Sequence, residues 1–101
     1  MPLSEAAKHA LLKVFQDQDT TTFQDIISLL SSIDQTELFN FLTQSVVPLR
    51  QHHRKLWTLF LSIKSYDHCI AFNQRVLTNN PNDYVARNTL AHSYLRKGQF
   101  D

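Results

Sequence analysis

Several apolar and aromatic positions of this chain recur at an interval of 34 residues. The matching pairs are Leu56 with Leu90, Phe60 with Tyr94, and Tyr66-Asp67 with Phe100-Asp101. A fixed period of this size is typical of stacked helical hairpins, because one hairpin cannot bury its apolar face alone. The period therefore favours a function carried by an extended, curved surface over one carried by a catalytic pocket.

The composition agrees with one all-α domain. Hydrophobic residues make up 43% of the 101 residues, so a packed core is expected, and one glycine with three prolines argues against a loop-rich or sheet-rich fold. The lone cysteine, Cys69, excludes an internal disulfide framework and is typical of a reducing, cytoplasmic setting. No apolar run approaches the ~20 residues of a membrane span, and Met1–Ser4 is not followed by a signal-peptide apolar region. We therefore expect no membrane contact.

Six helices are expected, three of them before Pro48. The first runs from about Ser4 to Gln16, with Ser4 as its N-cap. The second and third helices are expected to open at two pairs with capping-box spacing, Thr21 with Gln24 and Asp34 with Glu37.

The other three helices follow residue 47. The fourth is expected from about Pro48 to Ile63, since proline is accepted in a first helical turn, and the fifth from about Tyr66 to Thr78. The run Asn79-Asn80-Pro81-Asn82 is a strong stop signal. The sixth helix is then capped by Asp83 or Asn82 and ends near Lys97, with Gly98 at the C′ position.

From Pro48 to Asp101 the chain resembles the tetratricopeptide repeat family, whose unit is a 34-residue pair of antiparallel helices. Five residues follow the family's pattern for a first helix and the turn after it: Leu90, Ala91, Tyr94, Gly98 and Phe100. Cys69 and Val76 stand where the second helix has small residues, and Pro81 where the closing proline belongs. The resemblance covers one complete unit, residues 50–83, and the opening helix of the next.

The resemblance implies helical hairpins stacked as a short right-handed superhelix, an α-α solenoid. Residues 1–47, about three helices, keep little of the repeat and are expected to form a divergent N-terminal cap. The unit at 50–83 departs from the family pattern at Trp57, which replaces a small residue, at Asn73, which replaces an aromatic one, and at Lys64, which replaces the turn glycine. We expect Trp57 to widen that hairpin or to fill a cleft against the N-terminal helices.

Nothing in the sequence indicates catalysis, a metal or a cofactor. His52-His53 and His68-Cys69 are adjacent pairs, and adjacent helical side chains point about 100° apart, which does not suit a shared metal. The single glycine excludes a P-loop or dinucleotide fingerprint. Cys69 is expected to be a small buried residue between two helices, not a nucleophile. The chain is therefore expected not to be an enzyme.

In the tetratricopeptide family the first helices of successive units line a concave groove. The residues that the resemblance places there are Gln51, Arg54, Lys55, Thr58 and Leu61 from the fourth helix and Val85, Asn88, Thr89, His92 and Arg96 from the sixth. Arginine and lysine there suit a peptide carboxylate or an acidic segment, and the resemblance assigns Asn88 to a peptide backbone. A merely solvated basic face is the alternative.

The charge distribution also favours an acidic partner for the second half. Residues 1–45 hold six acidic and two basic side chains (net −4), whereas residues 46–101 hold three acidic and eight basic ones (net +5). Nucleic acid is disfavoured, because the total charge is only +1 and the aromatic residues are needed for packing.

We expect a protein–protein interaction scaffold, at the N-terminal end of a longer repeat protein, that binds a protein or peptide in a mildly basic groove. Two alternatives stay open. The chain could be a non-catalytic regulatory or substrate-presenting region ahead of an enzyme domain, such as a glycosyltransferase domain. It could also be a self-association module that forms a homodimer through its last helix, which carries Leu90, Tyr94 and Leu95.

Overall fold

The computed structural model describes residues 3–98, and within that range its only regular elements are helices, which confirms the all-α class. The elements are α1 (Glu5–Asp17), α2 (Thr20–Ile27), α3 (Ser32–Val46), the 3₁₀ turn η1 (Arg50–His52), α4 (His53–Ser62), α5 (Tyr66–Asn79) and α6 (Tyr84–Lys97). None of these helices is both long enough and apolar enough to cross a bilayer.

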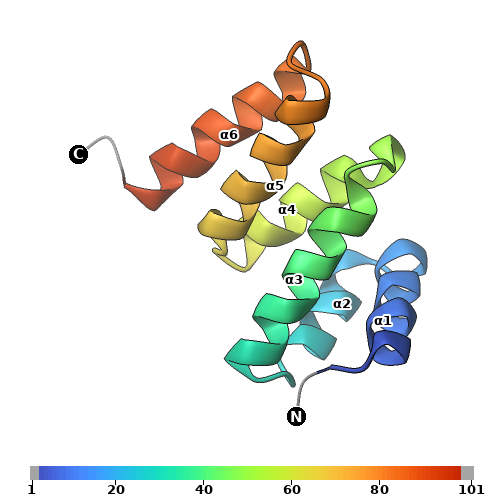
Figure 1. Ribbon diagram of the computed structural model, residues 1–101. Helices are drawn as coiled ribbons and strands as arrows, with labels where there is room; N and C mark the ends of the chain where they lie inside the picture. Colours follow the sequence, from blue (N-terminus) through green and yellow to red (C-terminus); the bar gives the residue numbers. More distant parts are fainter. Residues whose placement is uncertain (1–2, 99–101) are drawn as a thin grey trace.

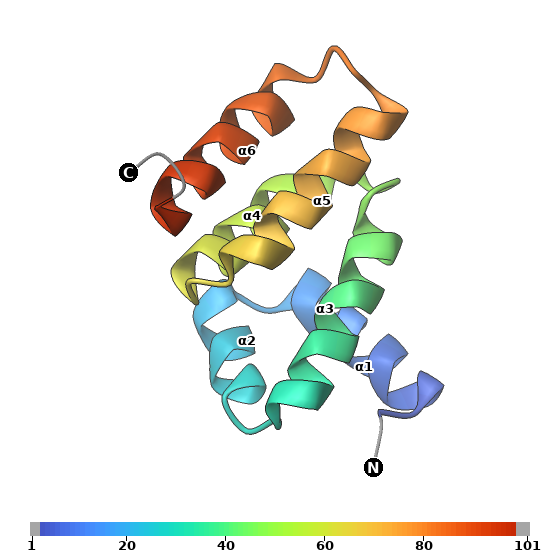
Figure 2. The ribbon, with the colours of Figure 1, turned by 60° about the vertical axis from the view of Figure 1, so that its left-hand side comes forward.

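The helices form two groups, one above the other in Figures 1 and 2. The lower group holds α1, α2 and α3, and the upper group holds α4, α5 and α6. In the upper group α5 runs antiparallel to both of its neighbours, so α4 and α6 point the same way. The lower group packs on the upper one through contacts of α2 and α3 with α4 and of α3 with α5.

One apolar core runs through both groups. Its buried members are Phe15, Phe23, Ile27, Leu38, Phe39, Leu42, Val46, Leu56, Leu59, Phe60, Cys69, Phe72, Val76 and Ala86. Aromatic rings meet edge to face across the helices, with centroids 5.3 Å apart for Phe39 and Phe60. Full burial of such a side chain contributes about 1.5–3 kcal/mol to stability. Because the core contains residues from before and after Pro48, it holds these two segments together. Cys69 is fully buried, as expected.

The beginnings of the first three helices are set by side-chain caps. Ser4 caps α1 as predicted, since its hydroxyl accepts a hydrogen bond from the Ala7 N–H at 3.1 Å. The predicted starts of the second and third helices are wrong. Asp19 caps α2 through the Thr22 N–H at 2.7 Å, and Ser31 caps α3 through the Asp34 N–H at 3.1 Å.

Thr21 and Asp34 therefore lie inside the first turns of these helices. The Asp19 carboxylate accepts hydrogen bonds from the backbone and the side chain of Thr22, and these hold the pKa of Asp19 below its ordinary value.

The fourth helix does not begin at Pro48, contrary to the prediction. Val47 keeps helical dihedrals at the end of α3, because its N–H still bonds to the Thr43 carbonyl at 3.1 Å. The chain leaves the helical region only at Leu49 (φ −104°, ψ 78°), and η1 precedes α4. Arg50, the first residue of η1, lies 34 residues before Tyr84, the first residue of α6. The turn η1 thus occupies the place that the first turn of α6 holds one period later.

The ends of α4 and α6 repeat the same backbone feature. Lys64 has φ 60° and Gly98 has φ 80°, and the two left-handed residues are 34 positions apart. After α4 the Ser65 N–H bonds to the Phe60 carbonyl at 2.8 Å and the Lys64 N–H to that of Leu61 at 3.1 Å, which is a Schellman motif. Lys64 thus adopts the conformation for which glycine is preferred.

The recurring apolar residues differ in burial. Leu56 and Phe60 are fully buried, whereas Leu90 and Tyr94 are half-buried. The reason is that α4 has helices on both sides, while α6 packs mainly on α5. Phe100 and Asp101, which complete the repeat, lie outside the described residues.

Candidate functional site

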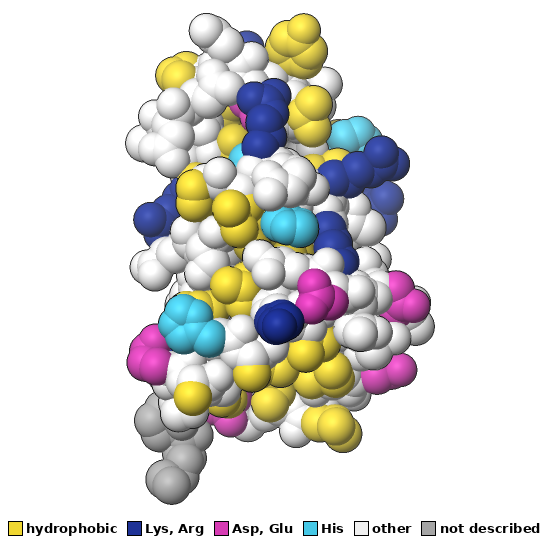
Figure 3. Space-filling view, turned by 90° about the vertical axis from the view of Figure 1, so that its right-hand side faces the viewer, with side chains coloured by type: hydrophobic (Ala, Val, Ile, Leu, Met, Phe, Trp, Pro, Cys, Tyr) yellow, Lys and Arg dark blue, Asp and Glu magenta, His cyan; other side chains and the backbone are white. Residues whose placement is uncertain are grey.

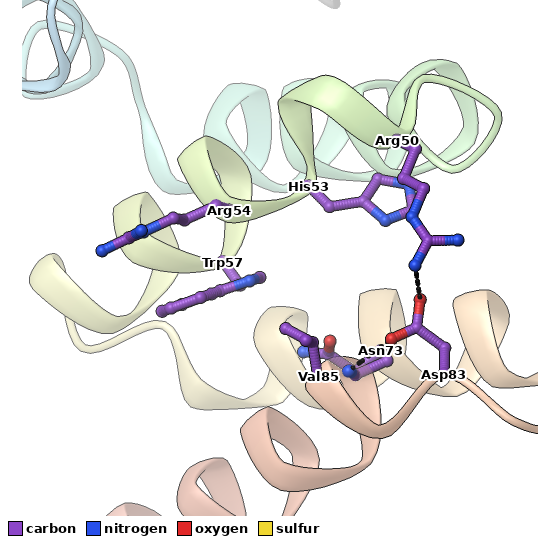
Figure 4. Close-up of a pocket in the computed structure, with 8 residues that line it drawn as sticks. Arg50, His53, Arg54, Trp57, Asn73, Asp83 and Val85 are labelled. Carbon is purple, nitrogen blue, oxygen red and sulfur yellow. Dashed lines mark hydrogen bonds and ion pairs between the residues drawn. The ribbon is translucent and has the colours of Figure 1, made fainter.

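A groove runs between α4 and α6, with α5 contributing to its floor. It consists of two adjoining recesses of about 320 Å³ and about 330 Å³ that share Trp57 and Val85. The first recess is lined by Arg50, His53, Arg54, Trp57, Asn73, Asp83, Val85 and Ala86, and the second by Trp57, Leu61, Val85, Asn88, Thr89 and His92. These lining residues define "the groove" below, and Figure 4 shows its first recess.

Helical periodicity explains why these side chains share one surface. On α4 the lining residues follow His53 at intervals of one, four and eight positions, and on α6 they follow Val85 at one, three, four and seven. Residues three or four apart lie on the same side of an α-helix. Each recess is lined by residues of both helices, so these two sides face each other across the groove.

Asp83 joins the end of α5 to the start of α6 and is the one acidic residue that lines the groove. One carboxylate oxygen caps α6 by accepting the Ala86 N–H at 3.0 Å, and the other lies 4.0 Å from the Arg50 guanidinium, as Figure 4 shows. The side chain is 8% exposed, whereas that of Arg50 is 74% exposed. Asp83 is thus committed to the cap, and Arg50 stays available to other anions.

Asn73 lies on the floor of the groove and is almost fully buried. Its Nδ2 donates to the Cys69 carbonyl at 2.8 Å and lies 3.5 Å from Cys69 Sγ. Because a carbonyl can only accept, this bond fixes which end of the amide is nitrogen. The amide oxygen Oδ1 therefore points the other way, into the first recess (Figure 4).

Cys69 lies beneath this floor and is fully buried. The Ser93 hydroxyl lies 3.0 Å from its sulfur. Burial raises the pKa of the Cys69 thiol, with the hydrogen bonds from Ser93 and Asn73 acting in the opposite sense. A buried thiol with a raised pKa is a poor nucleophile.

Trp57 forms the wall between the two recesses. One of its two expected positions, a cleft against the N-terminal helices, is wrong, because the structure places it on the groove side of α4. Its indole Nε1 is buried and has no hydrogen-bond partner among residues 3–98. Leaving a buried donor unpaired costs about 1–3 kcal/mol, which a bound acceptor would recover.

The groove is positive in character. Arg50 and Arg54 are both exposed along one wall, and Asp83 is the single acidic residue against them. The His53 Nε2 lies 2.8 Å from the Val47 carbonyl, so it is already hydrogen-bonded and is not free to donate to a ligand. Figure 3 shows one face of the molecule with Lys and Arg gathered mainly in its upper part and Asp and Glu mainly in its lower part.

The structure brings six of the predicted groove residues together and leaves four outside. Those that line the groove are Arg54, Leu61, Val85, Asn88, Thr89 and His92. Gln51, Thr58 and Arg96 are at least partly exposed but do not line either recess.

Lys55 faces away from the groove. Its Nζ donates to the Gln16 carbonyl at 3.2 Å and also to that of Gln18, and it lies 5.3 Å above the Phe15 ring. The cause is the helical step of about 100° from Arg54, which turns Lys55 toward the carbonyl end of α1. There the positive charge of Lys55 interacts favourably with the negative end of the α1 dipole.

Six groove residues were not predicted to line it: Arg50, His53, Trp57, Asn73, Asp83 and Ala86. Arg50 and His53 precede Trp57 by seven and four residues, and this helical spacing is the signal that places them on the same side as Trp57. Asn73 was noticed only as an exception to the family pattern. A polar residue at a buried position of an amphipathic helix is itself a signal of a polar contact.

Among the described residues, no three His, Cys, Asp or Glu side chains gather into a set that could hold a metal ion. Comparisons with models of known families, with curated proteins and with solved structures gave no match to this chain.

Proposed function

We propose that this protein is a cytoplasmic, non-enzymatic interaction module that binds an acidic peptide segment of a partner protein in the groove. In this proposal α4 and α5 form one tetratricopeptide-like hairpin and α6 opens the next, in a short right-handed superhelix capped by α1–α3. The 34-residue spacing of the left-handed residues Lys64 and Gly98 supports the hairpin repeat.

The observation that carries the proposal is the charge balance of the groove. Two exposed arginines, Arg50 and Arg54, face a recess whose one carboxylate is buried and already capping α6. Guanidinium groups bind carboxylates through paired, charge-assisted hydrogen bonds. The apolar faces of Trp57, Leu61 and Val85 beside them provide contact area for a peptide's aliphatic parts.

The test uses Trp57, which is the only tryptophan of the chain, as an intrinsic fluorescent reporter in the groove. Acetylated, amidated hexaglutamate is titrated into the wild-type protein and into Arg54→Glu. Charge-assisted hydrogen bonds contribute about 1.5–3 kcal/mol, so reversal of this charge should weaken binding roughly ten-fold or more.

The matched control is Arg75→Glu, which makes the same charge change at an exposed position of α5 outside the groove. We expect this variant to bind within about two-fold of the wild type. Equal weakening by both substitutions would show attraction to net charge alone, and an unsaturable titration of the wild type would reject the proposal.

Self-association is a second candidate, favoured by the outer face of α6. Tyr84 and Leu95 are 72% and 58% exposed, and with the exposed Ala91 they lie at i, i+7 and i+11 on one side of the helix. If this face pairs two copies, light scattering should report a dimer at high protein concentration and a monomer for Leu95→Glu. A monomer at all concentrations rejects this candidate and leaves the groove untouched.

A further inference from the structure

Two polar groups at the floor of the groove lack a partner among residues 3–98. The Trp57 Nε1–H is a buried donor without an acceptor. Asn73 is 1% exposed, and its hydrogen bonds within the described chain use only its nitrogen, which leaves Oδ1 as an acceptor without a donor. In Figure 4 the nitrogen end of the indole faces the side of the recess on which the Asn73 amide lies.

The geometry of the floor limits what could satisfy both groups at once. The ligand must present an acceptor to Trp57 and a donor to Asn73, and it must do so below the exposed arginines. A carboxylate offers acceptors only and would set its charge against the Asn73 oxygen. A carboxamide offers an acceptor oxygen and a donor NH₂ group on the same carbon, which matches the requirement.

A side chain reaches this floor more readily than a peptide backbone does. Trp57 Nε1 is a buried atom and Asn73 is 1% exposed, while Arg50 and Arg54, which would hold an acidic peptide, are exposed at the rim. An extended peptide lying along the rim projects alternate side chains downward, so its backbone amides stay level with the arginines.

We infer that the groove contains a subsite for a primary carboxamide, formed by Trp57 Nε1–H and Asn73 Oδ1. The acidic segment that it takes carries a glutamine or asparagine side chain between its acidic residues. This inference rests on the proposed function and narrows it from acidic peptides in general to those with such an amide.

The test compares three fluorescein-labelled, amidated pentapeptides of the form Glu-Glu-Xaa-Glu-Glu, in which Xaa is glutamine, asparagine or leucine. Binding is followed by fluorescence anisotropy with the wild-type protein and with Trp57→Phe, which keeps an aromatic ring but removes the N–H. The wild type should bind the glutamine or asparagine peptide roughly three- to ten-fold more tightly than the leucine peptide. Trp57→Phe should bind the three peptides with nearly equal affinity, because phenylalanine has no N–H to donate.

A second measurement does not depend on the variant's folding. The single indole N–H proton of the wild type should move downfield in NMR spectra with the preferred amide peptide and stay in place with the leucine peptide. The subsite is wrong if all three peptides bind with equal affinity, or if the indole proton does not shift with the amide peptide. Either result leaves the proposal of an acidic-peptide groove unaffected. Failure of all three peptides to bind overturns the groove and the subsite together.

Discussion

Replacement of Asp83 by alanine should destabilise the fold more than a surface substitution would. The carboxylate caps α6 through the Ala86 N–H at 3.0 Å, and the side chain is only 8% exposed. Loss of an N-cap costs about 0.5–2 kcal/mol, and we expect about 2 kcal/mol because the freed Ala86 N–H is buried. The contact with Arg50, at 4.0 Å and with an exposed partner, should add much less than 1 kcal/mol.

The conservative variant Asp83→Asn separates these two contributions, because asparagine caps a helix as well as aspartate does. It should lose less than about 0.5 kcal/mol. Urea unfolding followed by circular dichroism gives both values, and the alanine variant should also melt about 8–16 °C lower, at roughly 4–8 °C per kcal/mol. Equal losses for the two variants would show that the ion pair matters and the cap does not, which would refute the reasoning.

The remaining predictions concern the α4–α5 turn and the pH dependence of stability. Lys64→Gly should stabilise the protein by about 0.5–1 kcal/mol in urea titrations. Glycine avoids most of the ~1–2 kcal/mol cost of φ 60°, and the greater entropy of the unfolded glycine chain cancels only part of this gain. Lys64→Ala should not stabilise the protein in this way. His68 packs against Phe39 with ring centroids 5.1 Å apart, and burial, opposed by the charge of Asp67, lowers its pKa. The unfolded chain thus binds a proton at His68 more readily than the folded one, so the free energy of unfolding should fall as the pH drops below about 6.5. Urea midpoints at pH 7.5 and pH 5 should differ less in His68→Gln than in the wild type, while His92→Gln at an exposed site keeps the wild-type difference.

Local sequence signals were sufficient for the helices whose ends have one clear marker. Ser4, Asp83 and Gly98 cap helices as predicted, and α5 ends within one residue of its predicted end, just before Pro81. The 34-residue interval also appears in the backbone, at Lys64 and Gly98. These features depend on neighbouring residues only, which is why sequence alone reveals them.

The wrong helix starts have a common cause. Two capping residues lay within three positions of each other before α2 and again before α3, and local propensity does not choose between them. The structure uses the earlier residue, Asp19 and Ser31, in each case. At Pro48 the extension of α3 through Val47 overrides the usual restriction on the residue before a proline.

The candidate site was predictable as a surface but not in its details. The family resemblance placed Arg54, Asn88 and His92 on one groove, and these three residues do line it. The direction of Lys55 depends on where α1 packs, and the direction of the Trp57 indole depends on α6, so both require tertiary structure. For the same reason, the unpartnered atoms of Trp57 and Asn73 could not be inferred from the sequence.

The most direct test of the groove is a map of amide shifts in two-dimensional ¹H–¹⁵N NMR during titration with acetylated, amidated hexaglutamate. If the acidic peptide binds between α4 and α6, the shifts should concentrate at Arg54, Trp57, Val85, Asn88 and His92. The amides of α1 and of Arg75 should stay in place. Shifts spread over every exposed basic residue, or an unchanged spectrum, would contradict the account.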